Sequence, residues 1–123
     1  MIIAAVINSE MDILPIVEGS ILRLYNTETK EYIDYENPAL HLKEGRRGAT
    51  LSFAEEKGAT AFVTPPQTFC QLSYAKAKKD GIQFYHLEQQ ITFKEFKELI
   101  DYNKLQIRNE LPEEDIAPSG VPQ

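Results

Sequence analysis

Cysteine is almost absent from this chain, because Cys70 carries the only thiol among its 123 residues. One cysteine can form no intrachain disulfide, and it cannot build a metal site from thiolates alone. Any metal ion or cluster therefore needs further ligands of another kind, or a partner protein. A lone free thiol is typical of a reducing compartment, so we expect the protein to be cytoplasmic.

Long apolar runs and an excess of positive charge are missing as well. No stretch approaches the roughly 20 apolar residues of a membrane-spanning helix, and no basic segment precedes the apolar residues 2–7 as it would in a signal peptide. The net charge of −6 argues against a general nucleic-acid binder, because such affinity rests on lysine and arginine, although a localised basic patch stays compatible with it. We expect no membrane and no nucleic acid among the partners.

The motifs of common catalytic sites are absent too. The chain contains no Gly-x-Ser-x-Gly, no P-loop, no Cys-x-x-Cys and no His-Glu-x-x-His. Nucleophilic, phosphoryl-transfer and thiol-redox chemistry therefore lack their usual groups. A two-metal nuclease needs acidic residues on its central strands, and residues 2–7 include none. We expect a protein that is not an enzyme.

Strand patterns dominate the first third of the chain. Residues 2–7 form a continuous apolar run, typical of a central strand that is covered on both faces. Residues 20–25 and 31–35 alternate apolar and polar side chains around a polar turn, which predicts an antiparallel hairpin. The 42% hydrophobic content and the length fit one domain, which we place at residues 1–101. The proline-rich, acidic residues 102–123 are predicted to form a mostly flexible tail.

Helices and short strands alternate in the rest of that domain. The patterns predict helices at residues 49–57, 65–79 and 93–101, with Thr64 as the N-cap of the second, and buried strands at 60–63 and 82–85. The last helix begins with the clearest signal, a capping box formed by Thr92 and Glu95. We therefore expect an α/β fold with a mixed five-stranded sheet in the order 3-2-1-4-5, strand 2 antiparallel, and helices on both faces.

In this topology the carboxyl ends of strands 1, 3, 4 and 5 share one edge, where open α/β sheets bind ligands. Residues 37–49 form one of the loops at that edge and lead into a helix. Backbone amides gather at a helix start, so Arg46, Arg47 and Gly48 make a candidate anion cradle, together with Thr64 and Gln67 in the neighbouring loop. The alternative for the two arginines is surface pairing with glutamates such as Glu44, Glu55 and Glu56.

Three side chains are candidate metal ligands. His41 lies in the same loop as the arginines and is either an imidazole ligand or a solvated histidine. Cys70 falls near a helix start, where the dipole favours a thiolate, and is otherwise a small buried side chain. His86 ends a predicted strand and is either a second imidazole ligand or a hydrogen-bonded, partly buried residue.

Over about residues 1 to 101 the sequence resembles the dinitrogenase iron-molybdenum cofactor-binding family. The resemblance rests on six features: the apolar first strand, the hairpin at Tyr25 to Thr29, Glu36-Asn37-Pro38, the helix entrance at Gly45 to Gly48, Glu56-Lys57-Gly58-Ala59, and Lys79-Asp80-Gly81-Ile82. It implies a ribonuclease H-like fold and a carrier of an iron-molybdenum cofactor or iron-sulfur cluster for nitrogenase maturation. The implied partners are the metallocluster and a protein of the maturation machinery.

The chain departs from the family pattern at two places. Pro15-Ile16-Val17-Glu18 stands where members commonly carry a His-Phe-Gly-Arg motif, and Thr64-Pro65-Pro66-Gln67 replaces a glycine-rich turn. Two functions therefore stay open. The protein is either a small non-catalytic cluster carrier, or a divergent member that binds no cofactor and serves as a protein-interaction or assembly domain, as a monomer or a homodimer.

Overall fold

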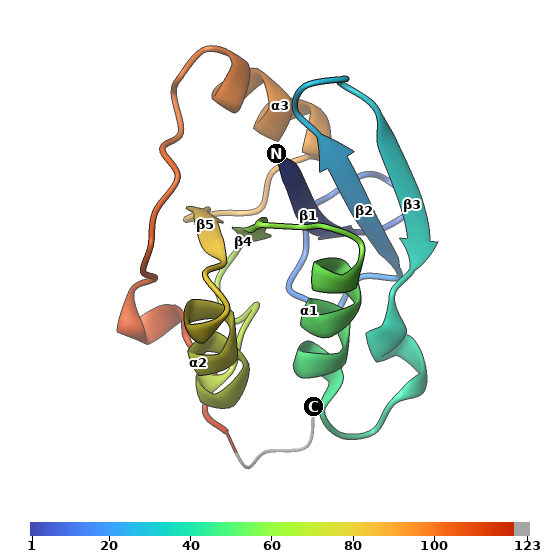
Figure 1. Cartoon of the computed structure of the whole chain (residues 1–123), viewed down its shortest axis with the longest axis vertical. Helices are drawn as coiled ribbons and strands as arrows, with labels where there is room; N and C mark the ends of the chain where they lie inside the picture. The colour runs from blue at the N-terminus through green and yellow to red at the C-terminus, as the bar shows by residue number, and fades with distance from the viewer. Residues whose placement is uncertain (120–123) are drawn as a thin grey trace.

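The computed structural model describes residues 1–119 and is built around the central strand β1 (Ile2–Ile7). β1 pairs antiparallel with β2 (Ile21–Asn26) on one side and parallel with β4 (Ala61–Thr64) on the other. β3 (Tyr32–Glu36) and β5 (Gln83–His86) complete the sheet in the order β3-β2-β1-β4-β5 (Figure 1). β2 runs antiparallel to both of its neighbours. The predicted strand order and directions are confirmed.

The apolar character of β1 follows from its position between two cores. Ala4 and Val6 belong to the hydrophobic cluster on one face of the sheet. Ile3, Ala5 and Ile7 belong to the cluster on the other face. Alternate side chains of a strand point to opposite faces, so a strand buried on both faces needs apolar residues at every position.

Helices cover both faces of the sheet, as predicted. α1 (Arg46–Glu56) and α2 (Gln71–Lys79) lie side by side on one face (Figure 1), and Leu51 and Ala77 carry them into the core there. α3 (Phe93–Asp101) covers the other face, mainly through two phenylalanines. Two short 3-10 helices, η1 (Pro38–His41) and η2 (Glu113–Asp115), lie outside these layers. Among residues 1–119, no helix is long and apolar enough to cross a membrane.

The predicted start of α2 at the two prolines is wrong. Pro65 and Pro66 instead lie in a turn, where Gln67 has a φ of 70° and Thr68 Oγ1 donates a hydrogen bond to Pro65 O at 2.8 Å. The helix begins at Gln71. A left-handed backbone angle ends any helical continuity, so the prolines form the approach to the helix and not its first turn.

The capping box at the start of α3 is confirmed. Thr92 Oγ1 accepts a hydrogen bond from Glu95 N at 3.1 Å, and Glu95 Oε1 accepts one from Thr92 N at 3.1 Å. We expect Thr92→Ala to lower the free energy of unfolding by about 1 kcal/mol, because it leaves a helix amide without its partner. Urea denaturation measures this change. Thr60→Ala, at an exposed position before β4, is the control, and equal stability of the two variants would contradict the cap.

The segment after α3 lies along β5 and does not extend into solvent. Figure 1 shows it, in orange to red, running from α3 past β5 toward α2. Phe84 and Arg108 exchange two backbone hydrogen bonds, at 2.7 and 2.8 Å, which pair the segment with the outer edge of β5. Further along, Asp115 O accepts from Gln67 N at 2.8 Å, and Ala117 N donates to Phe69 O at 2.9 Å.

These contacts differ from the flexible tail expected for residues 102–123. The prediction used the composition of the segment, which is rich in proline and acidic residues. It did not include the outer edge of β5, whose unpaired backbone groups can bind an adjacent segment. Leu105, Ile107 and Leu111 then pack partly buried against the two cores. Residues 120–123, the last part of that predicted tail, lie outside the described residues.

Candidate functional site

The carboxyl ends of β1, β3, β4 and β5 lie at one edge of the sheet, because these strands all run in the same direction. We call this edge the carboxyl rim. Its loops are residues 8–20, 37–45, 65–70 and 87–92. Backbone hydrogen bonds join the first loop to the last, from Ile13 N to Ile91 O at 2.9 Å and from Phe93 N to Met11 O at 2.8 Å. The predicted convergence of these loops is confirmed.

Asn37, fully buried, links three parts of the rim. Its Nδ2 donates to the carbonyls of Ile16 and Gly19, both at 2.8 Å. Its Oδ1 accepts from Ala39 N at 3.2 Å and from Thr50 Oγ1 at 2.6 Å. One side chain therefore holds the loop after β1, the start of η1 and the helix α1 together. The sequence analysis used Asn37 only as part of a family pattern and missed this role.

Arg46 begins α1 and bonds to backbone carbonyls of two rim loops. Its Nε donates to Ala39 O at 2.8 Å and its Nη2 to Val17 O at 3.1 Å. Because the guanidinium is planar and rigid, these two hydrogen bonds hold the loop after β1 and the η1 segment at a fixed distance from each other. In this structure Arg46 therefore joins two rim loops, and these contacts are not the surface glutamate pairing offered as its alternative.

Arg47 is buried and braces the loop between β4 and α2. Its Nε lies 3.3 Å from Gln67 O and 3.2 Å from Thr68 O, and its Nη2 lies 3.1 Å from Gln67 O. Burial lowers the pKa of Arg47 from its ordinary value, because it disfavours the charged form, and an electrostatic interaction with Cys70 opposes that shift. These hydrogen bonds hold the loop that leads to Cys70.

Cys70 is the N-cap residue of α2 and is nearly buried, with 6% of its surface exposed. Its Sγ lies 3.3 Å from Ser73 Oγ, and its backbone N donates to that oxygen at 2.9 Å. Burial is the largest single influence and raises the pKa of the thiol, but hydrogen bonds with Ser73, Ser119 and the backbone of Leu72 together leave the pKa below its ordinary value. Cys70 is thus nearly buried and also has a lowered thiol pKa, which combines features of both alternatives predicted for it.

The other predicted cofactor-binding residues have different environments. Thr64 ends β4, is buried, and donates from Oγ1 to Tyr85 O at 3.2 Å. Gln67 donates from N to Asp115 O at 2.8 Å and from Nε2 to Glu114 O at 3.3 Å, so it binds η2. Gly48 lies in the first turn of α1, where an added Cβ would meet no atom within 4 Å. Open space therefore adjoins the start of α1.

His41 lies in η1, beyond the β3 edge of the sheet, and its exposed imidazole contacts the Glu36 carboxylate. It is far from Cys70 in the sheet order, because β2 and β1 separate β3 from β4. Among residues 1–119, no three His, Cys, Asp or Glu side chains converge as a metal site.

His86 stands at the end of β5 in a hydrogen-bonded chain of three side chains. Its Nε2 lies 2.5 Å from Asp115 Oδ2, and its Nδ1 lies 3.2 Å from Arg108 Nη1. Arginine has donors only, so Nδ1 accepts and the proton on Nε2 is donated to Asp115. Of the two alternatives predicted for His86, the structure shows the hydrogen-bonded, partly buried residue. The sequence analysis missed Arg108 and Asp115, because both belong to the segment predicted to be flexible.

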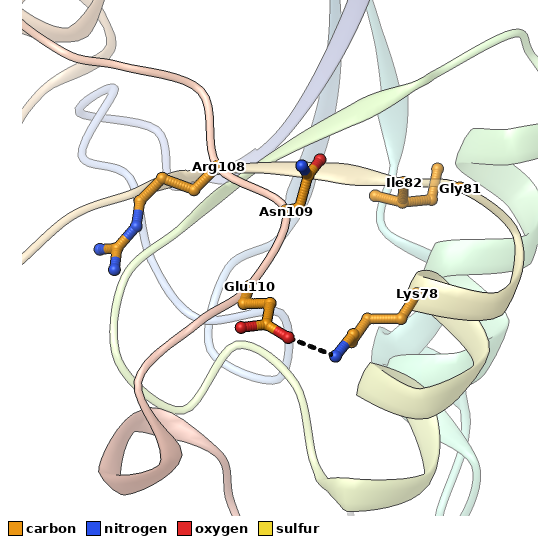
Figure 2. Close-up of a pocket in the computed structure, with 6 residues that line it drawn as sticks. All are labelled: Lys78, Gly81, Ile82, Arg108, Asn109 and Glu110. Atoms are coloured by element: carbon orange, nitrogen blue, oxygen red, sulfur yellow. Dashed lines mark hydrogen bonds and ion pairs between the residues drawn. The ribbon is translucent and has the colours of Figure 1, made fainter.

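Arg108 stands between two hollows at the β5 edge. One, of about 690 Å³, lies between the end of α2 and residues 108–110, and an ion pair from Lys78 Nζ to Glu110 Oε1 at 3.1 Å spans it. Figure 2 shows the Arg108 side chain extending away from that ion pair. The other hollow, of about 460 Å³, lies on the side of His86.

Two solved structures share the fold of nearly the whole chain. The apo form of the orange protein from Desulfovibrio gigas aligns over 99% of this chain and 95% of its own, with a TM-score of 0.72 and 12% identity. A candidate NifB protein from Thermotoga, of the DUF35 family, aligns over 92% of this chain and 97% of its own, with a TM-score of 0.63 and 14% identity. No protein-family model and no curated protein matches the chain. The chain therefore has the fold of the orange protein and of the NifB candidate.

Proposed function

We propose that the protein is a small non-catalytic carrier of an anionic metallocluster, of the iron-molybdenum or iron-sulfur class, held at the carboxyl rim. The observation that carries this proposal is the position of Cys70 as the nearly buried N-cap of α2, at the end of the loop that Arg47 contacts. Its Sγ lies 3.3 Å from Ser73 Oγ, and the pKa of the thiol is below its ordinary value. Thiolates are the side chains that bind iron in clusters.

The charge at this site suits an anionic cargo. A thiolate bound to a cluster places negative charge in a partly buried site, which is costly without a cation nearby. Arg47 supplies that cation. The hydrogen bonds from both arginines to backbone carbonyls keep the surrounding loops in place. The first turn of α1 adds polarised backbone amides beside the open space at Gly48. Arg46 and Arg47 thus act through position and charge and need not touch the cluster.

Access to Cys70 requires a local movement. Ala117 N donates to Phe69 O and Ala117 O accepts from Gln71 N, so the end of the described chain lies against the residues on both sides of the thiol. Few buried apolar residues hold this end in place, and segments of that kind open at low cost. In this proposal, cluster loading displaces the segment from Cys70.

The comparisons support a cofactor-related role without specifying the cargo. The orange protein was solved as an apo form, which is the state of a cofactor-binding protein without its cofactor. The second neighbour is a NifB candidate, and the sequence itself resembles the nitrogenase cofactor-binding family. These three observations agree on a small cofactor-related protein, and the thiol supplies the chemistry.

Anaerobic reconstitution with ferrous iron and sulfide tests the proposal. The wild type is expected to become brown and to retain iron and acid-labile sulfide after desalting. Cys70→Ala is expected to lose most of both, because it removes the thiolate ligand at small cost in packing. His41→Ala is the control and is expected to stay brown, since Glu36 holds that imidazole at the opposite edge of the sheet. Colourless wild-type protein without iron, or a Cys70→Ala variant that binds as much iron as the wild type, would refute the carrier.

The free edge of β3 supports a second candidate function, an assembly domain. β3 pairs only with β2 among the described strands, and Tyr32 and Ile33 on it are 50% and 61% exposed. Leu40 and Leu42 in the following segment are 43% and 42% exposed. Exposed edge strands with apolar side chains pair with other chains. Iron-free protein that sediments as a dimer in the same experiment would favour this function over the carrier.

A further inference from the structure

The hollow of about 460 Å³ beside His86 is lined by both apolar and polar residues. It lies between the end of β5, the helix α3 and residues 105–108. Its apolar lining residues are Leu87, Ile91, Leu99 and Leu105, and its polar ones are His86, Glu88, Gln89, Gln106 and Arg108. Its volume falls within the range of small-molecule sites, about 300–1,000 Å³. This hollow is separate from the site of the proposed cluster.

Arg108 lines this hollow and makes two sets of contacts there. Its backbone exchanges two hydrogen bonds with Phe84, which hold its Cα beside β5. Its side chain donates to His86 Nδ1 at 3.2 Å. Within residues 1–119, His86 is the only hydrogen-bond or ion-pair partner of this guanidinium. Most of its five N–H donors are therefore available to a ligand.

The guanidinium contacts a partly buried pair, His86 and Asp115. The side chains of His86 and Asp115 are 9% and 18% exposed, and the Asp115 carboxylate accepts the proton on Nε2. Holding the proton there leaves the Nδ1 lone pair directed at Arg108. Surface arginines ordinarily sample many rotamers, whereas this one is held by a partner that is itself fixed. Such preorganisation is typical of a binding group.

We propose that this hollow binds a small carboxylic acid with an apolar body. The guanidinium fork of Arg108 matches a carboxylate, with which it forms two parallel charge-assisted hydrogen bonds. The four leucine and isoleucine side chains bury the apolar body. Glu88 also lines the hollow and repels a doubly charged phosphate more strongly than a singly charged carboxylate, so the carboxylate is favoured.

NMR titration of the cluster-free protein tests this site with 4-phenylbutyrate and its neutral analogue 4-phenylbutanamide. The carboxylate is expected to shift the amide signals of Leu87, Gln89 and Gln106 and the Nε–H signal of Arg108 in a saturable way. The neutral amide is expected to leave them unchanged at equal concentration. Equal shifts with both probes, or no shifts at the hollow with either, would overturn the proposal.

Three variants assign the binding to Arg108 and its support. Arg108→Gln is expected to weaken 4-phenylbutyrate at least about tenfold, because it removes a charged hydrogen-bond donor. Lys78→Gln, at the neighbouring hollow, is the matched control for a lost positive charge and is expected to bind like the wild type. Cys70→Ala is also expected to bind like the wild type, which separates this site from the proposed cluster site. Unchanged affinity in Arg108→Gln would refute the role of Arg108.

Asp115→Asn tests whether the partly buried pair positions Arg108. An amide in place of the carboxylate can donate to Nε2 and so favours the proton on Nδ1, which turns that nitrogen away from its role as acceptor. The imidazole ¹⁵N shifts of His86 are expected to report the change of tautomer, and the affinity for 4-phenylbutyrate is expected to fall with it. A changed tautomer with unchanged affinity would overturn the positioning role.

Discussion

Asn37→Ala is expected to lower the free energy of unfolding by about 4 kcal/mol. The substitution removes two donors and one acceptor from a site with no solvent exposure. The carbonyls of Ile16 and Gly19 and the hydroxyl of Thr50 then lose their partner inside the protein. Each buried polar group left without a partner costs about 1–3 kcal/mol, which far exceeds the net value of a hydrogen bond at the surface.

Urea denaturation of matched variants measures this effect. Asn109→Ala is the control, because Asn109 is exposed and makes one surface hydrogen bond, to Gln83 Nε2 at 3.1 Å. Its stability is expected to stay within about 0.5 kcal/mol of the wild type. A loss below about 1 kcal/mol in Asn37→Ala would mean that water or local relaxation replaces the four hydrogen bonds. The rim would then not depend on Asn37.

The sheet was predictable because its order follows from patterns that repeat along the chain. The doubly covered strand β1 requires apolar residues at every position, and residues 2–7 show them. The alternating hairpin and the later short strands then leave few topologies that satisfy the rule of right-handed crossovers. The carboxyl rim and its four loops follow from that order alone.

The contacts of the arginines were not predictable in the same way. Arg46 and Arg47 lie at a helix start, as predicted, but their hydrogen-bond acceptors are the backbone carbonyls of residues 17, 39, 67 and 68. Every residue has a carbonyl, so no residue type marks such a partner in a sequence. The hydrogen bonds of Asn37 to the carbonyls of Ile16 and Gly19 are hidden for the same reason.

The segment after α3 shows a second limit of sequence patterns. Proline and acidic residues indicate a flexible tail when a segment is considered alone. Here the segment lies along the outer edge of β5. Isolated apolar side chains of the segment, such as Ile107 and Leu111, pack against the two cores. Their spacing matches neither a helix nor a long strand. His86 therefore had no visible partners in the sequence, although it was identified as a residue of interest.

Phe69→Ala is expected to lower the free energy of unfolding by about 4 kcal/mol. The ring of Phe69 is fully buried and packs edge-on against Phe62 and Phe84, with centroids 5.4 and 5.8 Å apart. Its removal leaves a cavity between α2 and the sheet that rigid neighbours cannot fill. Leu72→Ala is the control, since Leu72 is 74% exposed only three residues later and is expected to change stability by less than about 0.5 kcal/mol.

Phe69 also connects the core to the rim, because it immediately precedes Cys70 in the loop that Arg47 braces through Gln67 and Thr68. If the ring anchors this loop, Phe69→Ala is expected to raise the rate at which a thiol reagent modifies Cys70 under native conditions, whereas Leu72→Ala is not. Local opening then exposes a thiol that is otherwise nearly buried. A destabilised variant with an unchanged modification rate would show that the braces of Arg47 hold the loop without the ring, and would assign the shape of the rim to hydrogen bonds and not to the core.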